Sequence, residues 1–320
     1  MMRLRNVGSL LVVCLSLTVA PLRPLQAGPY SAIYSFGDSL TDTGNVYLAT
    51  GGTLPPAGYY NGRFSNGPLW IDHLAVQLGL APLTPAIVPG GTNYAVGGAT
   101  SGSGFTPLGS PNLLTQIGLF QSNLGGGPAD SSALYTINAG GNDFLGGELN
   151  PATPAGNISL AIQALAALGA RHVLVLDLEL IGSTPRALAS LSPIQQAGLN
   201  LLSQSFSNQL KANVAGLRSS LGIELSMADI FDTFQQVHAN PGAFGFTNVS
   251  DGAYLVGDFA ANGYLYWDDI HPSAAAHALM AQRALAALPE PSTLVLLGLG
   301  VFGLSWSLRG SRRSASRTTV

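Results

Sequence analysis

Short apolar runs alternate with longer stretches of helical spacing along the middle of the chain. The short runs are rich in β-branched or aromatic residues and nearly free of charge, as is typical of strands covered on both faces. They span residues 32–36, 92–96, 133–137, 172–178 and 223–227. The longer stretches bury one helical face and span residues 68–78, 113–124, 157–168, 193–217 and 272–288. This alternation predicts an α/β fold, a parallel sheet with helices on both faces.

Four irregular segments rich in Gly, Pro, Ser, Asn and aromatic residues interrupt this pattern, at residues 45–66, 81–91, 99–111 and 240–267. They predict loops. In open α/β sheets the loops at the carboxyl ends of the strands build the ligand site, so we expect the chemistry there. Aromatic residues in these loops, Tyr59 among them, could wall a pocket.

The amino-terminal segment has the order of a secretory signal peptide. Arg3 and Arg5 precede an apolar run over residues 7–20, and the small residue Ala27 comes directly before Gly28. A first transmembrane helix is the alternative, but the run is shorter than the about 20 apolar residues that a bilayer requires. We therefore expect residues 1–27 to be a signal peptide that is removed on export.

The carboxyl-terminal segment carries a second membrane signal. Pro289-Glu290-Pro291 precedes an uncharged apolar stretch over residues 292–308, and a cluster of arginines follows. About 17 apolar residues are just enough to cross the hydrocarbon core, and a basic cluster stays on the cytoplasmic side. The pattern predicts a transmembrane helix with the body of the chain, residues 28–288, facing outward.

These three parts in this order resemble the PEP-CTERM sorting tail of Gram-negative bacteria that make exopolysaccharide. The resemblance implies that an exosortase recognises residues 289–320 and cleaves near the Pro-Glu-Pro motif. The protein would then reach the cell surface or the surrounding exopolysaccharide. An ordinary carboxyl-terminal anchor with a chance Pro-Glu-Pro is the alternative, because an apolar span with a basic end is generic.

The distribution of charge argues against one class of partner. Seven of the 13 Lys and Arg residues lie in the two terminal segments, which leaves residues 28–288 clearly acidic. Nucleic acid is therefore not expected as a partner, because phosphate binding needs a basic footprint. About 260 residues are enough for one α/β domain with a well-buried core.

Two short segments hold the residue types of a serine nucleophile and its base. Gly37-Asp38-Ser39-Leu40 directly follows the first predicted strand, where a turn exposes the hydroxyl. Asp268 stands three residues before His271, so it can hold the ring Nδ1 and leave Nε2 free as a base. Asp269 lacks this spacing and is the alternative partner. Each segment by itself could be an ordinary polar turn.

Two further segments offer hydrogen-bond donors for a tetrahedral oxyanion. Gly97 and Gly98 follow the second predicted strand, where no side chain blocks a substrate oxygen, and Asn142 follows the third. One such donor is worth roughly 3 kcal/mol of activation barrier. Taken singly, the first segment could be a packing turn and the second a helix cap.

Together the four segments resemble the GDSL family of esterases and lipases, also called SGNH hydrolases. The family's blocks occur in order, with Ser39 in the first, Gly98 in the second, Asn142 in the third and Asp-x-x-His in the last. The resemblance runs from about residue 33 to residue 277. A Gly-x-Ser-x-Gly sequence is absent, so the nucleophile elbow of α/β-hydrolases is not present.

The resemblance implies a flavodoxin-like, three-layer α/β/α sandwich with a five-stranded parallel sheet. It also implies that Ser39, Asp268 and His271 form a catalytic triad. The backbone N–H groups of Ser39 and Gly98 and the side chain of Asn142 would form the oxyanion hole, with Gly97 in place of Gly98 if the alignment shifts by one residue. The expected function is hydrolysis of carboxylic esters, among them lipids or acylated sugars, without a metal or cofactor.

A non-catalytic surface or matrix protein that binds glycans through this fold is the rival interpretation, because a fold does not fix a function. The complete set of reacting residues favours the enzyme. The remaining histidines are expected to be structural or solvated, namely His73, His172, His238 and His277. The only cysteine, Cys14, lies in the signal segment, so a zinc site is not expected. Four other acids are expected to support turns, a cap or a strand end, namely Asp38, Asp143, Asp177 and Glu179.

Overall fold

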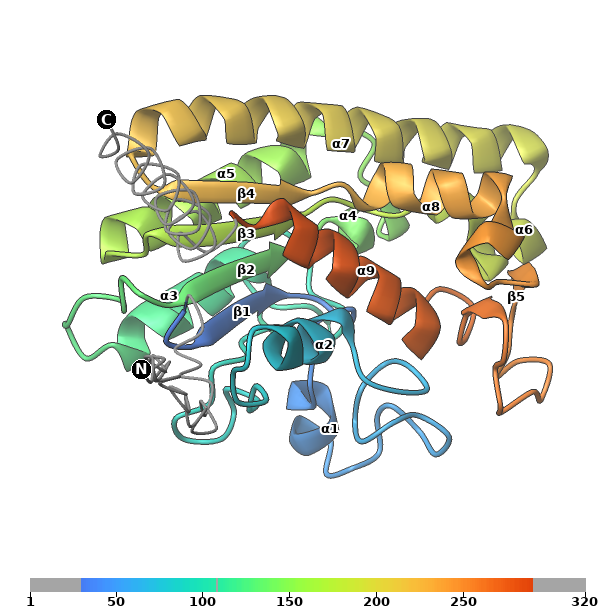
Figure 1. Ribbon diagram of the computed structural model, residues 1–320, viewed down its shortest axis with the longest axis horizontal. Helices are drawn as coiled ribbons and strands as arrows, with labels where there is room; N and C mark the ends of the chain where they lie inside the picture. The colour runs from blue at the N-terminus through green and yellow to red at the C-terminus, as the bar shows by residue number, and fades with distance from the viewer. Residues whose placement is uncertain (1–29, 108, 290–320) are drawn as a thin grey trace, which may run out of the picture.

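A four-stranded parallel sheet forms the centre of the molecule (Figure 1), a computed structural model that describes residues 30–107 and 109–289. Its strands are β1 (Ile33–Gly37), β2 (Leu134–Asn138), β3 (His172–Leu176) and β4 (Glu224–Ala228), in that spatial order. The register aligns Gly37 with Asn138, Asn138 with Leu176, and Leu176 with Ala228. All four strands therefore end at one edge of the sheet.

Alternate residues of the strands face two separate hydrophobic cores. Leu174 and Leu176 of β3 belong to one core, and Val173 and Val175 belong to the other, as the two-residue period of a strand requires. The first core is covered by α2 (Trp70–Gln77), α8 (Ile230–Ala239) and α9 (Ala274–Ala287). The second core is covered by α3 (Leu113–Asn123), α5 (Ala152–Leu168) and α7 (Pro193–Leu221).

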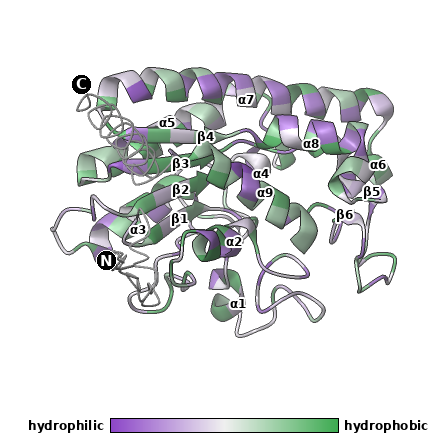
Figure 2. Cartoon of the chain, viewed as in Figure 1, coloured by the Kyte–Doolittle hydropathy of each residue, from purple (hydrophilic) through white to green (hydrophobic). Residues whose placement is uncertain are grey.

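These layers confirm the predicted α/β/α sandwich, and each predicted long helix is present. The sequence of α7 contains the signals that predict a helix over this stretch. Ser192 and Gln195 form a capping box around Pro193, and Gly222 ends the helix in the left-handed conformation. Phe206, Leu210 and Val214 recur four residues apart on its buried face. Figure 2 shows hydrophilic and hydrophobic residues alternating along α7, as expected of a helix with one exposed side.

The strand predicted at residues 92–96 is present only as an irregular edge. Its backbone pairs with β1, since Tyr94 N–H donates to the Ser35 carbonyl at 2.7 Å and Val96 N–H to the Gly37 carbonyl at 3.0 Å. Only an isolated bridge between Ser35 and Asn93 is regular, however. The Asn93 side chain accepts the Ala95 N–H at 3.0 Å, and this local turn breaks the ladder. The fifth strand position is therefore occupied without a full strand.

Short elements that the sequence pattern did not predict lie within the predicted loops and between the predicted strands and helices. They are α1 (Asn45–Ala49), α4 (Gly141–Leu145), α6 (Pro185–Ser190), the 3₁₀-helices η1 (Ile181–Ser183) and η2 (Pro241–Phe244), and the paired strands β5 (Asn248–Gly252) and β6 (Tyr264–Tyr266). They are too short for periodicity to reveal. Most of them lie near the carboxyl ends of the central strands, where they shape the site.

The predicted signal peptide at residues 1–27 lies outside the described residues. The same holds for the predicted membrane span at residues 292–308. Within residues 30–107 and 109–289, no helix combines the length and apolar character needed to span a bilayer.

Candidate active site

Ser39 stands in a tight turn that leaves the sheet at the end of β1. Gly37 has φ +144, and a Cβ there would lie 2.0 Å from the Asn138 carbonyl oxygen, so only glycine allows this close approach. Gln116 of α3 brackets Gly37, accepting its N–H and donating to its carbonyl, both at 2.8 Å. The turn is then closed by Leu40 N–H, which donates to Asp38 Oδ1 at 3.1 Å. This turn fixes the position of the serine hydroxyl.

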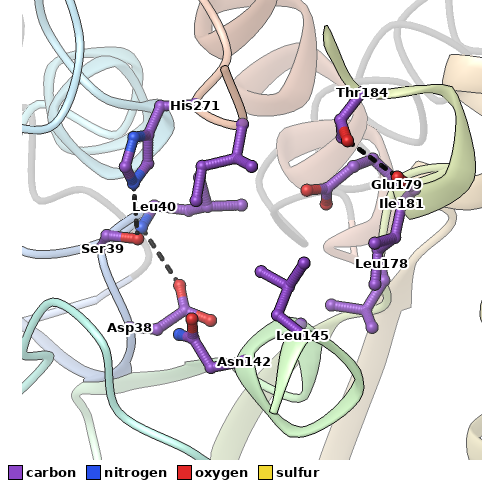
Figure 3. Close-up of a pocket in the computed structure, with 12 residues that line it drawn as sticks. Asp38, Ser39, Leu40, Asn142, Leu145, Leu178, Glu179, Ile181, Thr184 and His271 are labelled. Atoms are coloured by element: carbon purple, nitrogen blue, oxygen red, sulfur yellow. Dashed lines mark hydrogen bonds between the residues drawn. The ribbon is translucent and has the colours of Figure 1, made fainter. Parts of the chain in front are cut away.

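His271 approaches Ser39 from the opposite end of the sequence. Its Nε2 lies 3.0 Å from Ser39 Oγ, and its Nδ1 lies 2.6 Å from Asp268 Oδ2. Figure 3 shows the imidazole directed at the serine hydroxyl. The His271 side chain is only 12% exposed and that of Asp268 7%, so water competes little for these hydrogen bonds. The structure therefore brings together the three residues that the sequence analysis selected.

Asp268 is held as a carboxylate by several donors. Its Oδ1 accepts the backbone N–H groups of Ile270 at 2.9 Å and His271 at 2.7 Å, and its Oδ2 also accepts the Tyr59 hydroxyl at 2.6 Å. Burial alone would raise the pKa of Asp268, but the charge of His271 and the hydrogen bonds from His271 and Tyr59 lower it to about 2. Asp268 is thus ionised over the whole neutral range.

The alternative partner, Asp269, is engaged elsewhere. Its carboxylate accepts two hydrogen bonds from the Arg186 guanidinium, at 2.7 and 3.2 Å, and both side chains are partly exposed. Its carbonyl accepts the Arg186 N–H at 2.7 Å. Asp269 therefore ties the loop before α9 to α6 instead of orienting His271.

Asp42 determines which N–H group, that of Gly97 or that of Gly98, is available to a substrate. Gly97 N–H donates to Asp42 Oδ2 at 2.9 Å, so it is already used. Gly98 is exposed with φ +81, and among the described residues neither its N–H nor that of Ser39 has a hydrogen-bond partner. Asn142 donates one N–H of its amide to the Ala99 carbonyl at 3.0 Å, which fixes the amide and leaves its second N–H for another acceptor.

Gly97 serves packing instead. A Cβ at Gly97 would lie 2.7 Å from the Phe64 ring and 3.1 Å from Val46 Cγ2. The Phe64 ring in turn lies 5.1 Å from the His271 ring, measured between centroids. The missing side chain of Gly97 thus gives Phe64 the space in which it supports the imidazole.

Two further carboxyl groups line the pocket around Ser39, namely Asp38 and Glu179. Figure 3 shows them on opposite sides of the pocket. Burial raises the pKa of Asp38 to about 7, helped by the nearby Glu179, against the hydrogen bond from Leu40. Burial also raises the pKa of Glu179. The pocket therefore holds two acids that resist ionisation.

Two of the other acids selected from the sequence, Asp143 and Asp177, have structural roles, as expected. Asp143 accepts the Ser101 N–H at 2.8 Å and the Ser101 hydroxyl at 2.6 Å, so it joins α4 to the loop after Gly98. Asp177 follows β3 and accepts the Ile230 N–H at 2.6 Å, which caps α8. The sequence analysis did not predict a structural role for Asp42. The sequence Asp-Thr-Gly-Asn that begins with it is nevertheless typical of an Asx turn.

The remaining histidines do not approach Ser39. His277 is buried on α9, where it accepts the Trp70 N–H at 3.3 Å and burial lowers its pKa to about 3. His172 pairs with Glu224 at the start of the sheet. Among residues 30–107 and 109–289, no three His, Cys, Asp or Glu side chains gather closely enough to hold a metal ion.

Comparison with known proteins adds two family matches. A family of GDSL-like lipases and acylhydrolases matches residues 33–284, and the PEP-CTERM protein-sorting motif matches residues 287–313. An uncharacterized protein of Pseudomonas putida is 30% identical over 91% of this chain and 53% of its own length, so the chain spans about half of that relative. A GDSL esterase/lipase of Arabidopsis thaliana is 29% identical over 80% of this chain and 88% of its own.

The chain also matches solved structures. A member of the lipolytic protein G-D-S-L family from Veillonella parvula matches 80% of this chain and 96% of its own length. The TM-score is 0.44 and the sequence identity 18%.

Proposed function

The chain belongs to the family of GDSL-like lipases and acylhydrolases and is an ester hydrolase, and we propose that it is exported and cleaves carboxylic esters through an acyl-enzyme on Ser39. Ser39, His271 and Asp268 are the residues to which we assign the reaction. The rest of the proposal follows from the positions of their atoms.

In the first step, Ser39 Oγ attacks the ester carbonyl carbon while His271 Nε2 takes the hydroxyl proton. Asp268, bonded to Nδ1, stabilises the imidazolium that forms and keeps the ring in the tautomer with Nε2 unprotonated. The negative oxygen of the tetrahedral intermediate would be held by the N–H groups of Ser39 and Gly98 and by the Asn142 amide. Each donor can contribute a factor of about 10² to 10³ in rate.

In the second step, the imidazolium gives its proton to the leaving alcohol, and the acyl group stays on Ser39. Water then attacks the acyl-enzyme with His271 again as the base, and the carboxylic acid leaves. The His271 side chain is largely buried, so its ring cannot turn freely into solvent. This favours both proton transfers.

The observation that carries the proposal is the continuous hydrogen-bonded chain from Ser39 Oγ through His271 to Asp268, at 3.0 and 2.6 Å. Such spacing is within the reach that proton abstraction needs. A glycan-binding or scaffolding protein gains nothing from this chain of bonds.

The test compares the purified protein with its Ser39→Ala variant on p-nitrophenyl butyrate. We expect the variant to lose at least about 10³-fold in kcat, because without the nucleophile only binding and the oxyanion donors remain. Circular dichroism checks that the variant is folded. Equal rates for the two proteins would contradict the proposal and favour a non-catalytic surface protein.

Export is the second part of the proposal. The PEP-CTERM motif at residues 287–313 and the signal-like segment at residues 1–27 both support it. An exosortase would be the processing partner, and the cell surface of a Gram-negative bacterium the destination.

A further inference from the structure

A second, much larger cavity adjoins the pocket around Ser39. It has a volume of about 610 Å³ and lies between α4, α6 and the beginning of α7. The pocket at Ser39 has a volume of only about 30 Å³, enough for the reacting ester group and little more. Any longer part of a substrate must therefore lie beyond this pocket.

The two cavities are adjacent. Leu145, Ile181 and Thr184 line both of them. Figure 3 shows these three residues across the pocket from Ser39 and His271. A substrate whose carbonyl carbon lies at Ser39 Oγ would pass these residues to reach the larger cavity, which we call the α6–α7 groove.

The lining of the α6–α7 groove is mainly aliphatic and aromatic, including Phe144, Leu145, Leu149, Leu191, Leu199 and Leu202. Leu149 is 72% exposed and Leu145 38%, which leaves apolar surface open to solvent in the absence of a ligand. Covering such surface with an apolar ligand is favourable.

Most polar side chains of the groove are already paired within the protein. Gln195 accepts the Ser192 N–H and hydroxyl through Oε1, and only its amide N–H groups are without a partner among the described residues. The Thr184 hydroxyl donates to the Ile181 carbonyl at 2.8 Å, and the Ser190 hydroxyl donates to the Arg186 carbonyl at 2.6 Å. The Arg186 guanidinium is bound by Asp269. A sugar would need free donors and acceptors here, whereas a hydrocarbon chain needs none.

Gly198 of α7 provides an independent observation. Glycine is unfavourable in the middle of a helix compared with alanine. A Cβ at Gly198 would meet no atom within 4 Å, so neighbouring atoms do not require a glycine. Gly198 does line the α6–α7 groove, however, and the missing side chain leaves the groove open.

We propose that the α6–α7 groove binds the acyl chain of the substrate, so that the enzyme prefers esters of medium- or long-chain fatty acids to acetylated sugars. This inference depends on the proposed function, because the acyl carbon must lie at Ser39. From Gln195 to Leu202 the groove follows α7 for about 10 Å, the length of an acyl chain of roughly eight carbons.

The experiment measures kcat/KM of the purified full chain on p-nitrophenyl esters from acetate to laurate. We expect kcat/KM to rise roughly two- to fourfold for each methylene up to about eight carbons. Gly198→Phe fills the groove, so it should abolish this rise and flatten the dependence of kcat/KM on acyl-chain length. Gly198→Leu adds less bulk and gives the same test if the phenylalanine variant does not fold.

Gly216→Phe is the matched control. Gly216 lies on the same helix, is exposed, and has no atom within 4 Å of an added Cβ, but it is not part of the groove. This variant should keep the full chain-length profile. In a second series, acetate esters of ethanol to octanol, the dependence of kcat/KM on alcohol length should be the same in Gly198→Phe and in the unmodified enzyme, because the groove receives the acyl side.

A flat chain-length profile in the unmodified enzyme would overturn the acyl groove while leaving ester hydrolysis at Ser39 intact. An effect of Gly198→Phe that follows the alcohol instead of the acyl chain would also overturn it, and so would equal effects of Gly198→Phe and Gly216→Phe. Failure of the proposed function is separate, since it would appear as full activity in Ser39→Ala.

Discussion

Tyr59 links the aromatic loop cluster to the proposed catalytic carboxylate. Its hydroxyl donates to Asp268 Oδ2 at 2.6 Å, while its ring packs against Tyr254 and Trp267 with centroids 5.2 and 5.9 Å away. The hydroxyl therefore stabilises the ionised form of Asp268, and the ring holds the hydroxyl in place. A hydrogen bond to a charged group contributes about 1.5–3 kcal/mol.

Tyr59→Phe keeps the ring and removes only this donor. We expect kcat/KM to fall about tenfold, because the Asp268 carboxylate loses a donor that holds it against His271. Tyr254→Phe is the control, since the Tyr254 hydroxyl donates to the Ala57 carbonyl at 3.3 Å, away from the triad. An unchanged kcat/KM in Tyr59→Phe would exclude this positioning role.

Asp38 connects the site to the pH dependence of stability. Burial raises its pKa from 3.8 to about 7, so between these pH values the folded state holds a proton that the unfolded state releases. The free energy of unfolding contributed by Asp38 must then decrease as the pH rises from about 4 to about 7. Above that window, the folded protein carries a buried charge.

Asp38→Asn removes this ionisation, and the asparagine Oδ1 can still accept the Leu40 N–H. Relative to the unmodified protein, the variant should gain on the order of 1–3 kcal/mol of unfolding free energy between pH 4.5 and pH 8. Urea unfolding at the two pH values measures it. The same stability difference at both pH values would show that Asp38 does not titrate in this range.

The sequence alone predicts the contacts of some of these residues but not of others. Asp268 and His271 are three positions apart, so their contact follows from local geometry, and the structure places them in contact. Tyr59 is 209 positions from Asp268, and no local pattern predicts that contact. Which glycine N–H is available also required the structure, because Asp42 occupies that of Gly97.

At the scale of elements, the long helices were predictable because their apolar faces and caps repeat over several turns, as in α7. The edge at residues 92–96 was predictable as an extended segment but not as an incomplete strand, since the Asn93 side chain accepts the Ala95 N–H. The α6–α7 groove arises where short elements meet the start of a long helix, and periodicity does not reveal such junctions.

Gly97→Ala tests how the segment after residues 92–96 supports the loop before α9. The added methyl would press on the Phe64 ring, which packs on His271. We expect a loss of about 1–3 kcal/mol of stability and a clear decrease in kcat/KM, because the imidazole is displaced from Ser39.

Phe64→Leu should partly restore stability in the Gly97→Ala background, since a smaller side chain gives back the space. Urea unfolding of the two single variants and the double variant forms the cycle. Strictly additive losses would mean that Gly97 and Phe64 do not interact.

At the scale of the whole molecule, one domain carries the site, and we interpret the two terminal segments as sorting signals. The matches at residues 33–284 and 287–313 divide the chain in the same way as the apolar and basic patterns do. The limits of the domains remain predictions, because both terminal segments lie outside the described residues.

Deleting residues 292–320 removes the predicted span and its arginines. We expect the protein to lose its association with the membrane and cell surface and to keep its esterase activity, as measured by fractionation and p-nitrophenyl butyrate hydrolysis. Replacing only Pro289, Glu290 and Pro291 by alanine distinguishes a sorting tail from an ordinary membrane anchor. A sorting tail would then retain the uncleaved protein in the membrane, whereas for a simple anchor the change would have no effect.

The most direct test of the central claim is covalent labelling with a fluorophosphonate, followed by peptide mass spectrometry. If His271 activates Ser39, one phosphonyl group per molecule should appear on Ser39, esterase activity should disappear in parallel, and His271→Ala should label far more slowly. Labelling of a different serine, or full activity after Ser39 is modified, would contradict the account.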